Sequence, residues 1–305
     1  MPSTTTTLRC RSARRRTAVA AAVITTGLLL TACSGDDGDD SGRDGSDASS
    51  GTTISHIHGV DIGPSDGLLY VATHDGIYTP GPKGEPRLVG DRKDDFMGFT
   101  IAANGTFLAS GHPAPGRDAP ANLGLIESTD AGKTWKDKSL TGEVDFHSLD
   151  HAHDKVYGYD STNGLLRVSG DGVTWEKRGP LKALDIAVSP ADPDTVLATT
   201  ESGLTRSTDG GRTFGGGDAK PLMAFLDWTG PNALYGIDPS GAVSLSADGG
   251  KSWRKTGTVP GGGPQALTAV DARRLVAATQ DGVYESTDGG RTFTKRLAVT
   301  SGGDH

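Results

Sequence analysis

One eight-residue motif recurs through this chain at a nearly constant interval, and that interval constrains the fold more than any other feature. The motif Ser-Thr-Asp-Gly-Gly-Arg-Thr-Phe occupies residues 207–214 and 286–293, and close variants occupy residues 128–135 and 246–253. A version that is one residue shorter occupies residues 169–175. The aspartates of these motifs are 41, 38, 39 and 40 residues apart. A period near forty predicts a repeat architecture in which each repeat is one supersecondary unit.

The residue types of the motif are those of a tight hairpin turn. Its aspartate is suited to accept hydrogen bonds from amides just downstream, and its glycines supply the positive φ that a tight turn needs. The closing Trp or Phe can pack between neighbouring sheets. We therefore expect a structural role for the five motif aspartates, which are Asp130, Asp171, Asp209, Asp248 and Asp288.

This motif resembles the Asp-box of the sialidase-like, or BNR, β-propellers, and it recurs in register over nearly the whole chain after residue 54. The chain is similar to the bacterial lipoprotein branch of that family, whose members are commonly labelled exo-α-sialidase or glycosyl hydrolase. The resemblance implies an all-β fold with each box on the turn between the third and fourth strands of a blade, away from the ligand face. It implies little about chemistry, because one fold hosts many functions.

The chain contains six repeats with an inner strand, a second strand, a glycine, a third strand and a fourth strand, and in five of them a box precedes the fourth strand. The last repeat shows the pattern most plainly, with strands expected at Gln265–Val270, Arg274–Thr279, Gly282–Glu285 and Thr294–Ala298. The first repeat has a proline- and glycine-rich segment in place of its box. We predict a six-bladed β-propeller over residues 54–300, closed by apolar packing between first and last blades and without strand exchange.

The residues before the repeats have a different composition. Residues 1–32 carry five arginines and no acid around an apolar run, as a secretory signal peptide does. The four residues from Leu30 to Cys33 match a bacterial lipobox, which predicts cleavage before Cys33 and lipidation of its side chain. Residues 33–53 are mostly Gly, Ser and Asp and predict a flexible acidic tether. We therefore expect a lipoprotein on the outer side of the cytoplasmic membrane, exported by the Sec or the twin-arginine route.

Charge and cysteine content exclude two classes of site. Loss of the five signal arginines changes the formal charge from −8 to −13, which argues against nucleic acid as a partner. The other cysteine, Cys10, lies in the signal, so the expected mature domain has neither a disulfide nor a thiolate metal site.

Propeller topology places the starts of the inner strands and the loops between second and third strands on one face, the usual ligand face of this family. Alternation puts the first and third residue of each inner strand on the same side. In the first three repeats these pairs are His56 and His58, Asp95 and Met97, and Asp145 and His147. In the last three they are Pro180 and Lys182, Leu222 and Ala224, and Gly263 and Gln265. Ligand-type side chains are thus concentrated in one half of the ring.

The loops of the same face add His74 in the first repeat and His112 in the second. Arg92 and Arg117 are also placed there, where either would pair with an anionic ligand. The predicted ligand-binding set is therefore His56, His58, His74, Met97, His112, His147, Arg92 and Arg117.

Three kinds of function agree with such a face. The first is binding of a glycan or another small polar ligand by a degenerate relative of glycosidases. The second is a transition-metal site, in which zinc or copper would be held by His56, His58, His112 and His147, because imidazole suits both metals. Met97 would add a ligand for copper(I). The third is a protein-interaction or assembly scaffold that uses the rim of the ring.

Sialidase activity is not expected. Sialidases of this family use three arginines for the substrate carboxylate, a Tyr activated by Glu, and an Asp acid, whereas here only Arg92 and Arg117 fall on the predicted face. A glycosidase with two carboxylates would use Asp95 and Asp145 as its catalytic residues. Their separation would indicate retention at about 5 Å and inversion at about 6.5–9.5 Å.

A further set of aspartates recurs near the far end of the inner strands. Asp61, Asp150 and Asp185 fall at the same repeat position. Recurrence in three repeats predicts a structural role, such as pairing with the amides of an adjacent strand.

Overall fold

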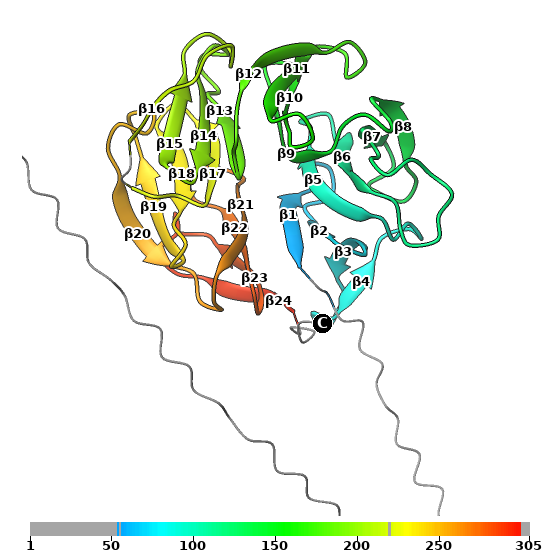
Figure 1. The fold of residues 1–305 in the computed structure, drawn as a ribbon. Helices are drawn as coiled ribbons and strands as arrows, with labels where there is room; N and C mark the ends of the chain where they lie inside the picture. Colours follow the sequence, from blue (N-terminus) through cyan, green and yellow to red (C-terminus); the bar gives the residue numbers. More distant parts are fainter. Residues whose placement is uncertain (1–53, 55, 219–220, 300–305) are drawn as a thin grey trace, which may run out of the picture. The chain divides into compact units, whose positions relative to one another are not determined.

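The computed structural model describes residue 54, residues 56–218 and residues 221–299. All regular elements in these ranges are β-strands, and they form six four-stranded antiparallel sheets. Each sheet takes four consecutive strands, and the six sheets are arranged as the blades of a propeller (Figure 1). The predicted six-bladed β-propeller is therefore confirmed. The signal peptide, the tether, Cys33 and His305 lie outside the described residues.

Four consecutive strands make each blade, with the inner strand first. Blade 1 contains β1 (Ile57–Ile62), β2 (Leu69–Thr73), β3 (Gly76–Pro80) and β4 (Pro86–Leu88). Blade 2 contains β5 (Asp95–Ile101), β6 (Phe107–His112), β7 (Leu125–Ser128) and β8 (Lys136–Ser139). Blade 3 contains β9 (Phe146–Ala152), β10 (Lys155–Asp160), β11 (Leu165–Ser169) and β12 (Glu176–Pro180).

The second half of the ring repeats this arrangement. Blade 4 contains β13 (Asp185–Val188), β14 (Val196–Thr200), β15 (Gly203–Ser207) and β16 (Gly215–Asp218). Blade 5 contains β17 (Phe225–Gly230), β18 (Ala233–Ile237), β19 (Ala242–Ser246) and β20 (Arg254–Thr258). Blade 6 contains β21 (Pro264–Ala269), β22 (Leu275–Thr279), β23 (Gly282–Ser286) and β24 (Thr294–Ala298). Among the described residues, no helix is long and apolar enough to cross a membrane.

The hydrophobic core consists of clusters between neighbouring blades. Between blades 1 and 2, for example, Tyr70 and Phe107 pack edge to face with ring centroids 4.7 Å apart. The box tryptophan Trp135 joins the same cluster, with its ring 5.1 Å from that of Phe96. The aromatic residue that closes this box therefore packs in the core between blades.

The ring closes where blade 6 meets blade 1. All four strands of blade 6 are consecutive in the chain, so no strand is exchanged across this seam. A single apolar cluster spans it, with Ile57 and Val71 on one side and Val276 and Val283 on the other. The inner strand β21 also contacts β1 directly. Apolar packing thus closes the ring, as predicted.

Each box aspartate organises its own turn. In the fourth blade, Asp209 accepts hydrogen bonds from the Ser207 hydroxyl at 2.7 Å, the Thr213 amide at 2.9 Å and the Thr213 hydroxyl at 2.6 Å. These bonds hold the pKa of Asp209 well below its usual range. Asp130, Asp248 and Asp288 bind their turns in the same way, and Asp171 accepts two amides of its shorter turn.

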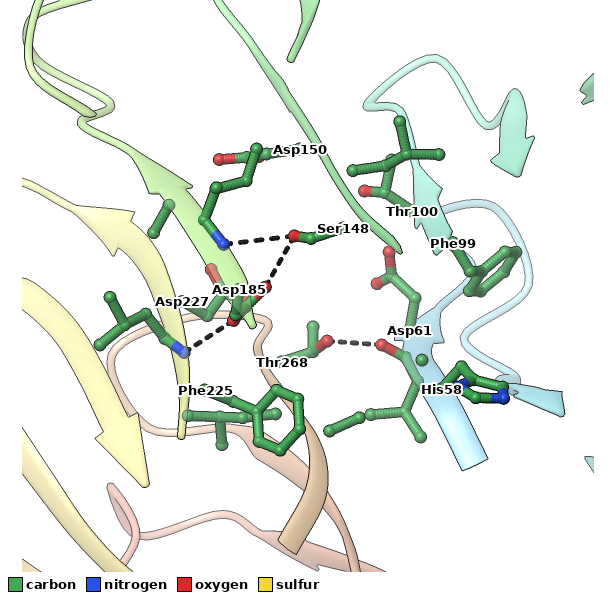
Figure 2. A pocket seen from close by; sticks show the side chains of 18 of the residues that line it. His58, Asp61, Phe99, Thr100, Ser148, Asp150, Asp185, Phe225, Asp227 and Thr268 are labelled. Atoms are coloured by element: carbon green, nitrogen blue, oxygen red, sulfur yellow. Dashed lines mark hydrogen bonds between the residues drawn. The ribbon is translucent and has the colours of Figure 1, made fainter. Parts of the chain in front are cut away.

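Aspartates on the inner strands join one blade to the next around the bore (Figure 2). Each carboxylate accepts an amide of the following inner strand: Asp61 from Ile101 at 2.8 Å, Asp150 from Val188 at 2.7 Å, Asp185 from Leu226 at 2.8 Å and Asp227 from Ala269 at 2.7 Å. The predicted pairing of Asp61, Asp150 and Asp185 with adjacent strands is confirmed. Asp227 has the same role and was not foreseen.

Two inner strands begin later than the sequence predicted. Pro180 and Leu222 were placed at their starts, but β13 begins at Asp185 and β17 at Phe225. The preceding outer strand lies at the edge of its blade, so the chain must first return to the centre across the three spacings between four strands. At about 4.8 Å per strand, this path takes about four extended residues. Lys182 and Ala224 therefore belong to segments along the mouth of the ring.

Candidate functional site

Three ligand-type side chains meet at the seam between blades 1 and 2. His58 lies on β1, His74 directly follows β2, and Asp95 begins β5. Nε2 of His58 is 3.2 Å from Nδ1 of His74, and Oδ1 of Asp95 is 3.5 Å from the former and 2.9 Å from the latter. All three atoms lie within 4.8 Å of one another. The sequence predicted that these residues would share a face, and the fold brings them together.

Hydrogen bonding leaves this group incompletely satisfied. Oδ1 of Asp95 is buried, and none of its contacts has hydrogen-bond geometry, although His74 lies close by. Zinc binds histidine nitrogen at 2.0–2.1 Å and carboxylate oxygen at 2.0–2.2 Å, so donors around a tetrahedral ion are about 3.3 Å apart. The three observed separations, from 2.9 to 3.5 Å, lie on both sides of that value. The donor set therefore fits a zinc-sized ion.

The protonation of His58 also suits metal binding. Burial, followed by the neighbouring His74 and His56 rings, lowers the pKa of His58 to about 3. The ring is thus neutral near pH 7, and its contact with Asp95 is not an ion pair there. A neutral imidazole is the form that binds a metal ion.

A second histidine and carboxylate group occupies blades 2 and 3. Nε2 of His147 lies 2.6 Å from Oδ2 of Asp145, and this hydrogen bond raises the pKa of His147. Nε2 of His112 is 3.4 Å from the same oxygen. Nδ1 of His112 donates to the Ala121 carbonyl at 2.9 Å, so Nε2 is the nitrogen that faces Asp145. Oδ1 of Asp145 is buried and has no hydrogen-bond partner.

His56 packs against the first group without joining it. Its ring centroid is 4.8 Å from that of His58 and 5.5 Å from that of His74. Its Nδ1 accepts a hydrogen bond from Nε2 of Gln265 at 2.9 Å. Because Nδ1 is engaged, His56 supports the neighbouring rings rather than offering that atom to a ligand.

The structure thus divides the four predicted metal ligands. His58 is joined by His74, which the sequence placed among the general ligand-binding residues, and by Asp95, which it placed among the catalytic ones. His112 and His147 gather on Asp145, the second predicted catalytic carboxylate. Each predicted catalytic aspartate therefore has nitrogens of two histidines within 3.5 Å of one carboxylate oxygen.

The two predicted arginines turn towards an internal carboxylate. Arg92 and Arg117 both bind Asp94, which is fully buried and also accepts the Ala114 amide at 2.8 Å. Burial opposes ionisation of Asp94, but these three donors outweigh it and hold its pKa below the usual value. A cavity of about 500 Å³ lies beside them, and no histidine lines it.

The remaining candidates do not join either group. Met97 is half-buried on β5, and no polar contact of its side chain is seen in the described part of the chain. His151 lies at the far end of β9, and His153, in the turn that follows, binds the Ser189 carbonyl in the next blade. These two histidines are therefore separate from the mouth.

A narrow bore lies beneath the histidines. Its cavity is about 100 Å³, and it is lined by His58, His147 and the inner-strand aspartates (Figure 2). Burial raises the pKa of Asp61 to about 7 and those of Asp150 and Asp185 to about 6, and it raises that of Asp227 well above its usual value. The bore therefore carries less negative charge near pH 6 than its composition suggests.

No protein-family model matches the chain, and no curated protein matches it. It is similar to the solved structure of a putative gluconolactonase, with 12% identity and a TM-score of 0.59 over 81% of this chain and 91% of that one. It is also similar to a catalytically inactive virginiamycin B lyase from Staphylococcus aureus with quinupristin, with 10% identity and a TM-score of 0.54 over 81% and 85% of the two chains. YCF48 bound to D1 peptide gives 16% identity and a TM-score of 0.50 over 80% and 83%.

These likenesses show the propeller fold alone. Their activities differ, and identities of this size carry no site residue from one chain to another. Membership of the Asp-box sialidase-like family stays a prediction.

Proposed function

We propose that this protein binds a divalent transition metal ion at the mouth of its propeller, with His58, His74 and Asp95 as ligands. The observation that carries the proposal is the convergence of their three donor atoms at the spacing of metal ligands, with a buried carboxylate oxygen that lacks a hydrogen bond. Zinc suits two imidazoles and a carboxylate, and copper(II) is a competitor because it generally binds such sites more tightly.

The geometry favours a site that is open to a further ligand. Three protein ligands leave one position of a tetrahedral ion free, which is the arrangement of catalytic zinc sites. The His74 side chain is 45% exposed, so the site faces the mouth and solvent. A metal ion there would supply a Lewis acid for an oxygen atom of a guest. His112 and His147, on the adjoining blades, are placed to hold a proton or a polar group of that guest.

The other predicted functions fit around this site. A small polar ligand, a glycan included, would bind as the guest of the metal ion. Sialic acid is a poor candidate, because Arg92 and Arg117 are engaged by Asp94. A scaffold function on the rim stays an alternative prediction.

We also propose that the domain is an Asp-box propeller exported as a lipoprotein, a proposal supported by the five boxes and by the lipobox ending at Cys33.

The test is metal binding by the full chain without an affinity tag. After dialysis against chelator, zinc and copper are titrated by calorimetry, and the bound metal is measured by mass spectrometry. We expect one ion per chain, and a rise in melting temperature with metal concentration, because the folded state alone holds the ligands together.

His58→Ala, His74→Ala and Asp95→Ala should each weaken binding at least tenfold. His151→Ala is the matched control, since it removes a histidine from the far end of an inner strand, and it should leave affinity unchanged. A wild-type protein that retains neither metal above buffer level would overturn the proposal. So would a triple variant that binds as well as the wild type.

A further inference from the structure

The mouth of the propeller has two chemically different halves. A cavity of about 830 Å³ lies across blades 3, 4 and 5, with Leu184, Leu222 and Met223 among the apolar side chains of its lining. It is bounded by the segments that lead into β13 and β17 and by loops between second and third strands. Those are the same positions in the repeat as the segments that carry His56, His74 and His112. The cavity therefore opens on the face of the metal site.

Two of the apolar residues that line this cavity are exposed to solvent. Leu184 and Leu222 are 53% and 44% exposed, and both belong to the few large apolar residues that are exposed on the described surface. Scattered exposed leucines need no explanation, but two that line one cavity mark a binding surface. The volume also lies in the range of small organic ligands, about 300–1,000 Å³.

The apolar cavity and the histidines share a boundary. Leu184 lines the apolar cavity and also the bore, and His58 and His147 line the same bore. Figure 2 shows that His58 and Phe225, the residue after Ala224 of the apolar cavity, border the same space. The bore and the apolar cavity therefore meet at Leu184.

We propose that the guest of this protein is amphipathic, with an oxygen-donor head that ligates the metal ion and an apolar tail of several carbons on Leu184, Leu222 and Met223. This inference rests on the proposed metal site for the head group. The charged residues around the tail cavity are Lys182 and Glu201, one of each sign, so the cavity selects by apolar surface and not by charge.

The experiment measures affinity against tail length. A series of straight-chain alkyl hydroxamates, from acetohydroxamate to octanohydroxamate, is titrated into the zinc-loaded full chain by calorimetry. Each methylene that is buried on binding should tighten the affinity about three- to fourfold. In the double variant Leu184→Ser/Leu222→Ser the gain per methylene should disappear, whereas acetohydroxamate affinity and zinc content should stay at wild-type values.

A matched control is Leu68→Ser, since Leu68 is 44% exposed like Leu222 but lies in the turn between β1 and β2, at the other end of the inner strands. It should keep the full dependence on length. If zinc is bound and the affinity does not change with tail length, the amphipathic guest is wrong and the metal site stands. If no zinc is retained before any hydroxamate is added, the proposed metal site is wrong, and so is the proposal that the head group of the guest ligates it.

Discussion

Nε2 of Gln265 lies 2.9 Å from Nδ1 of His56 and joins the last blade of the ring to the first. The same side chain accepts the Ile57 amide through Oε1 at 3.3 Å. These bonds link residues 208 and 209 positions apart in the chain, at the seam where the ring would otherwise open. Because the His56 ring packs on those of His58 and His74, the closure of the propeller and the geometry of the proposed metal site are coupled.

Gln265→Ala should therefore affect both stability and metal binding. Loss of two hydrogen bonds should lower the free energy of unfolding by about 1–2 kcal/mol, and the melting temperature by about 2–4 °C for each kcal/mol. Zinc affinity should fall severalfold, because His56 loses the contact that orients it. Gln280→Ala is the control, since that glutamine bonds Gly263 within blade 6 and does not cross the seam. Equal loss of zinc affinity in both variants would contradict this coupling.

Gly98 allows the second and third inner strands to approach closely. A Cβ atom at this position would lie 2.4 Å from the Phe146 carbonyl oxygen, so β5 or β9 would have to move. Gly98→Ala should lower the free energy of unfolding by about 1–3 kcal/mol, as overpacking does, and should weaken zinc binding because Asp95 lies on the same strand. Gly230→Ala on β17 is the control, since its Cβ would meet only Ala233 at 3.8 Å. Chemical denaturation and zinc titration of both variants would check this, and an unchanged Gly98→Ala protein would refute it.

The fold was predictable because the signal is local and repeated. Each box carries its own hydrogen-bonding residues, so five turns at a period near forty define the blades without any knowledge of contacts between them. The starts of β13 and β17 were missed because the sequence does not show how far the chain runs from the edge of one blade to the centre of the next. Asp227 was detectable, since it is the sixth residue from the predicted strand start at Leu222, as Asp61 is from His56 and Asp150 is from Asp145.

The candidate site was predictable only as a set of residues on one face. Topology placed His58, His74 and Asp95 together, but their partition from His112, His147 and Asp145 depends on side-chain directions at the seams. Gln265 was noted as an inner-strand residue, yet its bond to His56 follows from ring closure alone. Arg92 and Arg117 were expected to meet a ligand, and nothing in their spacing indicated that Asp94 would engage both.

A buried ion pair near the mouth of blade 3 should contribute much more to stability than an exposed one. Nε of Arg167 lies 2.7 Å from Oδ2 of Asp160, and both side chains are almost fully buried. Arg167→Met would leave a buried carboxylate without its counter-charge, which should cost about 3–5 kcal/mol. Lys138→Met breaks the more exposed pair with Glu127 and should cost less than about 1 kcal/mol. Urea unfolding of both variants measures the difference, and similar values would refute the argument.

The aspartates of the bore and those of the boxes should respond to pH in opposite ways. Burial raises the pKa of the bore aspartates, Asp61, Asp150, Asp185 and Asp227. Above about pH 4 the folded state therefore holds more protons than the unfolded state, and the contribution of these carboxyls to stability falls as pH rises. Hydrogen bonds within the turns lower the pKa of the box aspartates, to about 2 for Asp130. The contribution of the box aspartates to stability is therefore lost as pH falls below about 4. The lowered pKa of His58 also changes the stability between about pH 3 and 6.5. This change is common to variants and wild type, so it cancels in the difference between their free energies of unfolding.

Asp227→Asn and Asp209→Asn separate the two responses. Asp227 accepts a single amide, which the amide oxygen of asparagine can accept without a charge, and Asp61, Asp150 and Asp185 no longer repel it. The free energy of unfolding of Asp227→Asn, relative to wild type, should therefore increase from pH 4 to pH 8. Asp209→Asn should be less stable than wild type at pH 7 by an amount that is constant down to about pH 4 and shrinks at lower pH, because the wild type loses its charge there. Urea denaturation across this range gives both curves, and parallel curves for the two variants would show that the bore carboxyls are ionised like the box carboxyls.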